Sequence, residues 1–217
     1  MLNTVKSSPR IRAYIKLADA PLSALGYTDH SFSHVELVAK RAGELLTSLG
    51  YSRHEVELAE VAGYLHDVGN LVNRVGHSQS GAIIAFRLLE EAGLPPEDIA
   101  AVVTAIGNHD EGEGEPVSPI AAALILADKS DVRRSRVRNR DAATFDIHDR
   151  VNFSVLSSSL ERSEDGGRIT LTLSVDTAIS PVLDYFEIFL DRMLLCRRAA
   201  ARLGCRFSLV INGQVLL

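Results

Sequence analysis

The chain has 217 residues, of which 46% are hydrophobic and 24% charged, so it can bury one sizeable core or one core with a small appendage. Its net charge of −5 argues against a nucleic-acid polymer held by bulk positive charge, and its two cysteines are too few for a disulfide scaffold. Because the longest apolar run, PIAAALILA, is about half of a membrane span, we expect a cytoplasmic protein that does not bind membranes.

The part of the chain up to about residue 130 has the hydrophobic period and the end signals of α-helices. These signals predict five helices, over residues 33–50, 52–69, 78–92, 96–107 and 118–128. The first two begin with capping-box sequences, Ser33-His-Val-Glu36 and Ser52-Arg-His-Glu55. His66 and Asp67 therefore fall in the last turn of the second helix, and His109 lies just past the end of the fourth.

After about residue 141 the hydrophobic pattern changes to strict alternation. Val151, Phe153 and Val155 alternate with polar residues, the turn sequence EDGG follows, and residues 169–175 alternate again, which predicts a hairpin. Residues 181–203 have the pattern of a long amphipathic helix, and residues 205–217 that of one strand or two. The predicted fold is mainly α: a helical bundle domain over residues 1–145 and a small α+β module, of β-β-α-β order, over residues 146–217.

Side chains that bind borderline metal ions recur through the helical part. The set comprises His34, His66, Asp67, His77, His109 and Asp128. Imidazole nitrogens and carboxylate oxygens together suit iron, manganese, zinc, cobalt or nickel, and the absence of thiolates disfavours a structural zinc site. The glycines near His66 and Asp67 let the helix stop, so these neighbouring side chains can converge on one ion. The donor set favours a catalytic metal centre.

The order of these residues resembles the HD superfamily of metal-dependent phosphohydrolases, which are helical domains named for the His-Asp dipeptide. The resemblance rests on His34, on HDVGN at 66–70 and on LILADKSD, which contains Asp128. His77 in HSQSGA and His109 in IGNHD make the pattern similar to the two-metal branch, in particular to the bacterial symmetric dinucleoside-tetraphosphate hydrolases. The resemblance covers about residues 30–140 and implies nothing about the C-terminal module.

The resemblance implies a site with two divalent transition-metal ions, of which iron and manganese are the first candidates. One ion would be held by His34, His66, Asp67 and Asp128, the other by His77 and His109, with Asp67 bridging as the catalytic residue. The implied activity is a metal-dependent phosphohydrolase or phosphodiesterase that uses a metal-bridged hydroxide on a nucleotide or another small phosphate ester. Two departures are Asn70, where many relatives have lysine, and the short segment between His66 and His77.

An arginine cluster begins five residues after Asp128. Because Asn70 leaves a phosphate contact unfilled, we expect Arg133 and Arg134 to bind the substrate through their guanidinium groups. Asp110 and Asp131 could each orient an imidazole through its other nitrogen. His30, His54 and His148 fit no part of the pattern and are interpreted as ordinary core or surface residues.

Two other functions are compatible with this donor set. One is a mixed-valent di-iron oxygenase, which iron dependence and oxygen consumption would identify. The other is a sensory or binding module that keeps the metal site and is regulated through its C-terminal unit. That unit could pair sheets across a homodimer, because an isolated hairpin needs a further strand or helix for stability.

Overall fold

The computed structural model describes residues 1–217 and begins with a layer of helices. These are α1 (Leu2–Ser7), α2 (Pro9–Ala24), α3 (Phe32–Ser48), α4 (Arg53–Leu65), the 3-10 helix η1 (His66–Leu71), α5 (His77–Glu91), α6 (Pro96–Gly107) and α7 (Pro119–Lys129). The second part comprises η2 (Arg134–Arg136), η3 (Ala142–Thr144), α8 (Ile147–Ser154), β1 (Val155–Arg162), β2 (Arg168–Val175), α9 (Val182–Arg202), β3 (Arg206–Ile211) and β4 (Gln214–Val215). The fold is mainly α with a small C-terminal sheet, as predicted.

The capping chemistry of the first two predicted helices differs. The capping box of α4 is confirmed, because Ser52 and Glu55 exchange side-chain and backbone hydrogen bonds. The box at Ser33 is wrong: α3 begins at Phe32, its N-cap is Ser31, and neither the N-cap nor Ser33 caps the helix through its side chain. The Ser33 hydroxyl instead donates to Oδ2 of Asp29 at 2.5 Å. This hydrogen bond to a carboxylate in the preceding loop replaces the predicted cap.

The C-terminal sheet has four strands in the order β1-β2-β3-β4. β1 and β2 form the predicted hairpin, β3 pairs parallel to β2 after the crossover through α9, and β4 folds back on β3 at Asn212-Gly213. The start of the first strand was predicted wrongly, since Val151 and Phe153 lie in α8. Asp146 caps that helix by accepting from the backbone of Asp149, and the buried pairs Asp149 with Asn152 and Val151 with Ser154 are each three residues apart, which is a helical spacing.

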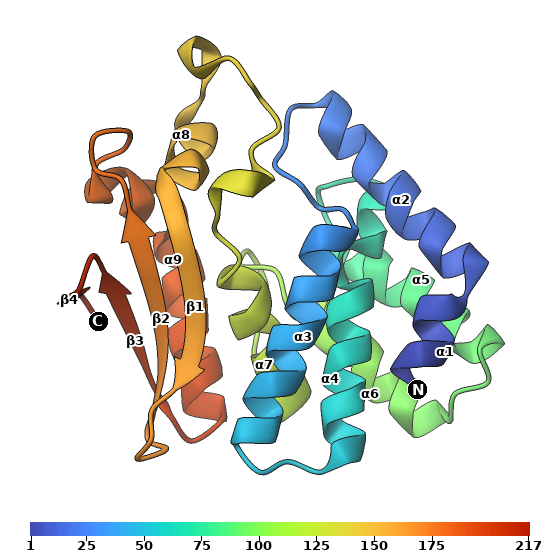
Figure 1. The fold of residues 1–217 in the computed structure, drawn as a ribbon. Helices are drawn as coiled ribbons and strands as arrows, with labels where there is room; N and C mark the ends of the chain where they lie inside the picture. The colour runs from blue at the N-terminus through green and yellow to red at the C-terminus, as the bar shows by residue number, and fades with distance from the viewer.

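One cluster of 50 buried hydrophobic side chains runs from Val5 to Ile211 and therefore crosses the predicted boundary at residue 145. α7 lies at its centre, with every residue from 120 to 127 buried, which matches a helix that is hydrophobic all round. Figure 1 shows α7 between the helical layer and the C-terminal sheet, with α9 covering one face of that sheet. The division into two domains stays a prediction, because the two parts share this core.

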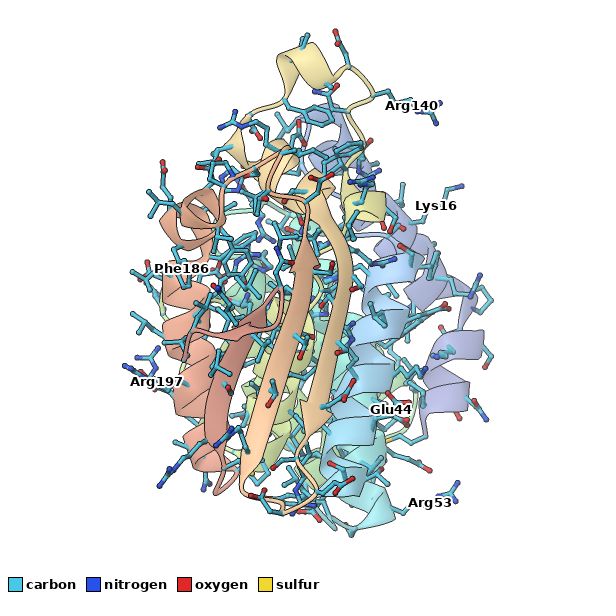
Figure 2. All side chains as sticks on the ribbon, turned by 60° about the vertical axis from the view of Figure 1, so that its left-hand side comes forward. Lys16, Glu44, Arg53, Arg140, Phe186 and Arg197 are labelled. Atoms are coloured by element: carbon cyan, nitrogen blue, oxygen red, sulfur yellow. The ribbon has the colours of Figure 1, made fainter.

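The surface carries charged side chains on both parts of the molecule. Figure 2 shows the labelled charged side chains Lys16, Glu44, Arg53, Arg140 and Arg197 projecting outward from the ribbon, and all five are exposed. None of the helices combines the length and the apolar composition that crossing a membrane requires.

Candidate metal centre

The structure brings all six predicted metal ligands together at one end of the helical layer. His34 comes from α3, His66 and Asp67 begin η1, His77 begins α5, His109 follows α6, and Asp128 lies in the last turn of α7. His66 and Asp67 are consecutive residues at the junction of α4 and η1, and both side chains face the same point, since Oδ2 of Asp67 lies 3.3 Å from Nε2 of His66. Five separate segments therefore converge on one point.

The six side chains form two adjoining groups of ligand atoms. In the first, Nε2 of His34 lies 3.2 Å from Nε2 of His66 and 3.3 Å from Oδ1 of Asp128. Oδ2 of Asp67 faces the same group, 3.3 Å from Nε2 of His66. The ligand atoms of His34, His66 and Asp128 all lie within 4.8 Å of one another.

The second group is formed by His77 and His109, whose Nε2 atoms are 3.1 Å apart. Oδ1 of Asp67 lies 3.6 Å from Nε2 of His77, so the two oxygens of this carboxylate face different groups. The ligand atoms of His66, Asp67 and His109 also lie within 4.8 Å of one another. Asp67 is thus the residue that the two groups share.

The other ring nitrogen of each histidine is held by an acceptor. Nδ1 of His34 lies 2.7 Å from Oδ2 of Asp131, and Nδ1 of His66, His77 and His109 lies within hydrogen-bond distance of the backbone oxygens of Gly63, Arg74 and Ile106. When each Nδ1 carries the proton, each Nε2 presents a lone pair toward the centre. Oδ2 of Asp67 is buried and accepts no hydrogen bond. Lone pairs facing one another beside an unpartnered carboxylate oxygen fit divalent cations.

Burial controls the protonation of these groups. It lowers the pKa of His109 well below its usual value, and the nearby charges of His66 and Lys129 act in the same direction, which keeps this ring in its ligating form. Burial also favours the protonated form of Asp67 and Asp128, but the neighbouring charges and hydrogen bonds, among them His66 and Lys129 respectively, together hold both pKa values well below the ordinary range. Burial disfavours the charged form of His66, yet Asp67 and Asp128 raise its pKa to about 10, so this ring carries a proton that a cation would displace. Two carboxylates and the neutral ring of His109 therefore lie ready for a cation.

The arginines predicted to bind substrate are engaged with other protein groups. Nε of Arg133 donates to Oδ1 of Asp131 at 2.7 Å, and Nε of Arg134 donates to the backbone oxygen of Phe153 at 2.6 Å. The guanidinium of Arg134 also lies over the Phe153 ring, 4.5 Å from its centroid. Neither side chain lines the cavity beside the metal ligands. Their role in substrate binding stays a prediction.

A cavity of about 550 Å³ opens onto Asp67, His77 and Asp128. Its cationic residues are Arg74, Lys129, Arg136 and Arg192. The lining also includes Asp146, His148, Asp149 and Asn152, from α8 and the residue that caps it. Arg74, which the sequence patterns did not indicate, lines the cavity, as do His30 and His148, which were expected to be ordinary core or surface residues. Arg74 could have been found from its spacing, because it precedes His77 by three residues.

Four imidazoles and two carboxylates gather beside a polar cavity, and this donor set suits a catalytic metal centre. Residues 31–133, a little under half of the chain, match the family model of the HD domain. The HD superfamily comprises metal-dependent phosphohydrolases, so the match of this segment indicates an enzyme with a divalent-metal site.

Three similar proteins illustrate the range of this similarity. The uncharacterized protein MJ1020 of Methanocaldococcus jannaschii is 25% identical over 203 residues, which cover 82% of this chain and 76% of that protein. Ribonuclease Y of Enterococcus faecalis is 27% identical over 158 residues, 71% of this chain and 28% of that enzyme. Ribonuclease Y of Thermosipho melanesiensis is 27% identical over 169 residues, 77% of this chain and 31% of that enzyme. This chain thus spans under a third of either ribonuclease.

Proposed function

We propose that the protein hydrolyses a small phosphate ester, with a nucleotide as the first candidate, at a centre of two divalent metal ions. The observation that carries this proposal is the position of the cavity: it ends on Asp67, His77 and Asp128, so a substrate phosphate can reach both groups of ligand atoms. Iron and manganese are the first metals to test, because the donor set is purely nitrogen and oxygen. Symmetric dinucleoside tetraphosphates should be included among the test substrates, because the sequence resembles the hydrolases that act on them.

The ligand set divides as the two groups suggest. His34, His66 and Asp128 would hold one ion, His77 and His109 the other, and Asp67 would bridge them with its two oxygens. Two bound cations supply an activated water near neutral pH and offset the charge that develops on the phosphate oxygens. The contribution of the chain is to fix the donors, because every histidine is oriented through its Nδ1.

Arg74 is the side chain that we propose for the phosphate contact that Asn70 leaves unfilled. Its Nη1 lies 3.7 Å from Oδ1 of Asp67 and 3.3 Å from Nε2 of His77, at the edge of the cavity. The other three cations have carboxylate partners outside the ligand set: Lys129 and Arg192 pair with Glu111, and Arg136 pairs with Asp131. The one carboxylate near Arg74 is that of Asp67, whose charge a bound metal would offset, and Nη1 of Arg74 also donates to Oδ1 of Asn70 at 3.5 Å.

Cleavage of RNA is the second candidate, supported by the similarity to two Ribonuclease Y proteins. The size of the cavity and the net charge of −5 favour a small ester over a long polyanion. A short RNA oligomer in the assay separates the two, since RNA cleavage at rates comparable to mononucleotides would favour the second candidate.

The test is a metal analysis followed by assays of the reloaded enzyme. Protein reloaded with manganese or iron should contain two ions per chain and should release phosphate or an alcohol from nucleotides or from bis(p-nitrophenyl) phosphate. Asp67→Asn, prepared and loaded identically, should be inactive. Oxygen uptake in the same samples tests the di-iron oxygenase. A fully loaded wild-type enzyme that hydrolyses no phosphate ester would overturn the proposal.

Self-association through the C-terminal module remains part of the proposal. The exposed apolar side chains of Leu183, Leu190 and Leu194 on α9 support it. The mass of the protein in solution, with and without charged substitutions at these positions, is the measurement that decides.

A further inference from the structure

The polar residues that line the cavity beside the metal ligands form two chemical sets. Arg74, Lys129, Arg136 and Arg192 are cations, which suits the anionic part of a phosphate ester. Asp146, His148, Asp149 and Asn152, from α8 and its cap, include no lysine or arginine. This α8 set lies outside the segment that matches the HD domain and belongs to the C-terminal part of the chain.

Two residues of this α8 set are buried, yet each keeps one acceptor atom that bonds to no protein group. Asp149 is 7% exposed and Asn152 5% exposed. Oδ2 of Asp149 accepts one bond from Nδ2 of Asn139 at 3.3 Å, and Nδ2 of Asn152 donates to the backbone oxygen of His148 at 2.9 Å. Oδ1 of Asp149 and Oδ1 of Asn152 accept no hydrogen bond from the protein, and neither is sealed from the cavity. These two acceptors are therefore held in place by largely buried side chains and are open to donors on a ligand in the cavity.

His30 adds a further acceptor to the lining of the cavity, and its ring lies 5.6 Å from that of His34. Its Nδ1 lies 2.6 Å from the backbone oxygen of Thr28, so with the proton on Nδ1 its Nε2 is an acceptor, and no protein group bonds to that atom. Apolar groups contribute little, since only three of the 17 lining residues are hydrophobic. Leu25 and Tyr27, two of these, lie at the exposed rim. The cavity therefore offers no apolar slot for an alkyl chain.

We infer that α8 and its cap, residues 146–152, form a recognition wall for the hydroxyl-rich part of the substrate, which makes the substrate class phosphate esters of sugars, either free or as the ribose of a nucleotide. Asp149 and Asn152 are the residues that read the hydroxyls, because each keeps one acceptor open to the cavity. Their roles are specificity-determining, since neither belongs to the groups of metal-ligand atoms. The inference rests on the proposed function for the placement of the phosphate.

The experiment measures binding with ligands that cannot be hydrolysed. Calorimetric titration of the manganese-loaded protein compares the phosphonate analogue of ribose 5-phosphate with methylphosphonate and with pentylphosphonate, which has no hydroxyls. Wild type should bind the ribose phosphonate at least about ten-fold more tightly than either of the others, as one or two hydrogen bonds to a buried carboxylate and amide would provide. The nucleoside phosphonate of adenosine is the fourth ligand: tighter binding than ribose phosphonate assigns the site to a nucleotide, and equal binding assigns it to a free sugar phosphate.

Asp149→Asn and Asn152→Leu keep the volume of each side chain and should each reduce the ratio of ribose phosphonate to methylphosphonate affinity by roughly three- to ten-fold, with the Kd for methylphosphonate and the metal content unchanged. Asp191→Asn is the matched control, because this exposed carboxylate on α9 makes no hydrogen bond or ion pair and does not line the cavity. It should leave the ratio as in wild type.

Equal binding of the ribose and pentyl phosphonates by wild type would overturn the inference. This comparison uses wild-type protein alone and does not depend on the folding of a variant. An unchanged ratio in both folded variants would overturn it as well. If the affinity ratios change as expected but the metal-loaded enzyme hydrolyses no phosphate ester, the inference about the recognition wall is supported and the proposed hydrolytic function is wrong.

Discussion

Nζ of Lys129 lies 2.8 Å from Oδ2 of Asp128, while Oδ1 of the same carboxylate faces the imidazoles of His34 and His66. Lys129 also lies 2.6 Å from Oε2 of Glu111, and Oε1 of Glu111 accepts from Arg192 of α9 at 2.8 Å. A buried chain of alternating charges therefore connects the candidate metal centre to the C-terminal helix.

This network makes a prediction about pH and stability. Burial favours the protonated form of Glu111, but Lys129 and Arg192 outweigh it and hold its pKa far below the usual 4.5. A depressed folded-state pKa contributes stability above the unfolded pKa, and that contribution is lost as the pH falls. Metal-free Glu111→Gln should therefore be less stable than wild type at pH 7, by about 2–4 kcal/mol of unfolding free energy, and the difference should shrink below about pH 4.5. Urea denaturation at several pH values measures it. Glu115→Gln, an exposed partner of Arg198, is the control, and a pH-independent difference would contradict the prediction.

The two groups of ligand atoms predict different metal losses. Asp67→Ala should lose both ions and all activity, because its two oxygens face both groups. His77→Ala should keep one ion per chain, since the donors of His34, His66 and Asp128 remain. Metal analysis after equilibrium dialysis gives the ratio. Two ions per chain in His77→Ala would show that His77 has only a structural role.

Arg74 should be the main phosphate contact. Arg74→Ala is expected to lower kcat/KM by about ten- to hundred-fold, the effect of losing about 1.5–3 kcal/mol of charge-assisted hydrogen bonding, with two ions still bound. Lysine at this position should restore part of the activity, because it keeps the charge but loses the planar fork. Arg140→Ala, an exposed arginine without hydrogen bonds, should behave as wild type. Alanine variants of Arg133 and Arg134 should be measured in the same series. If kcat/KM falls only in those two variants, the phosphate contact belongs to the arginines predicted from the sequence.

Gly69 holds His77 in place through close backbone packing. A Cβ at Gly69 would lie 1.9 Å from the backbone oxygen of His77 and 2.5 Å from the nitrogen of Gly81. Gly69→Ala should therefore destabilise the fold by about 1–3 kcal/mol and should lower the affinity for the second metal ion, because α5 must move. Gly107→Ala offers a matched control, since its nearest neighbours are 3.7 Å away. Thermal unfolding and metal titration of both variants make the comparison, and wild-type behaviour of Gly69→Ala would exclude the close packing.

The thiol of Cys196 should be inert in the native protein. The residue is 1% exposed, and burial raises its pKa to about 12, so roughly one thiol in ten thousand is ionised at pH 8. Iodoacetamide at pH 8 is expected to leave Cys196 unlabelled in buffer and to label it in urea, as peptide mass spectrometry would report. Rapid labelling without urea would indicate that α9 opens locally.

Some features of the fold follow from local sequence alone. The capping box at Ser52 and the apolar run of α7 are local patterns, and both appear in the structure. Two predictions failed where a neighbour outside the pattern intervened. The Ser33 hydroxyl donates to Asp29 and does not cap α3. The alternating residues after Asp146 form α8, whose N-cap is Asp146. A short sequence pattern does not include such competing hydrogen bonds, because the residue that makes them lies outside the pattern.

By itself the sequence determined the donor set and the helical core, because residue type fixes metal preference and hydrophobic period fixes which face of a helix is buried. Only the tertiary structure decided which cations and acceptors face the cavity. Arg74, His30 and Asn152 come from segments far apart in the chain, yet all three line one cavity. Asn152 does so because the helical part and the C-terminal part share one hydrophobic core, which brings α8 into the lining beside Asp67, His77 and Asp128, a position that no local pattern encodes.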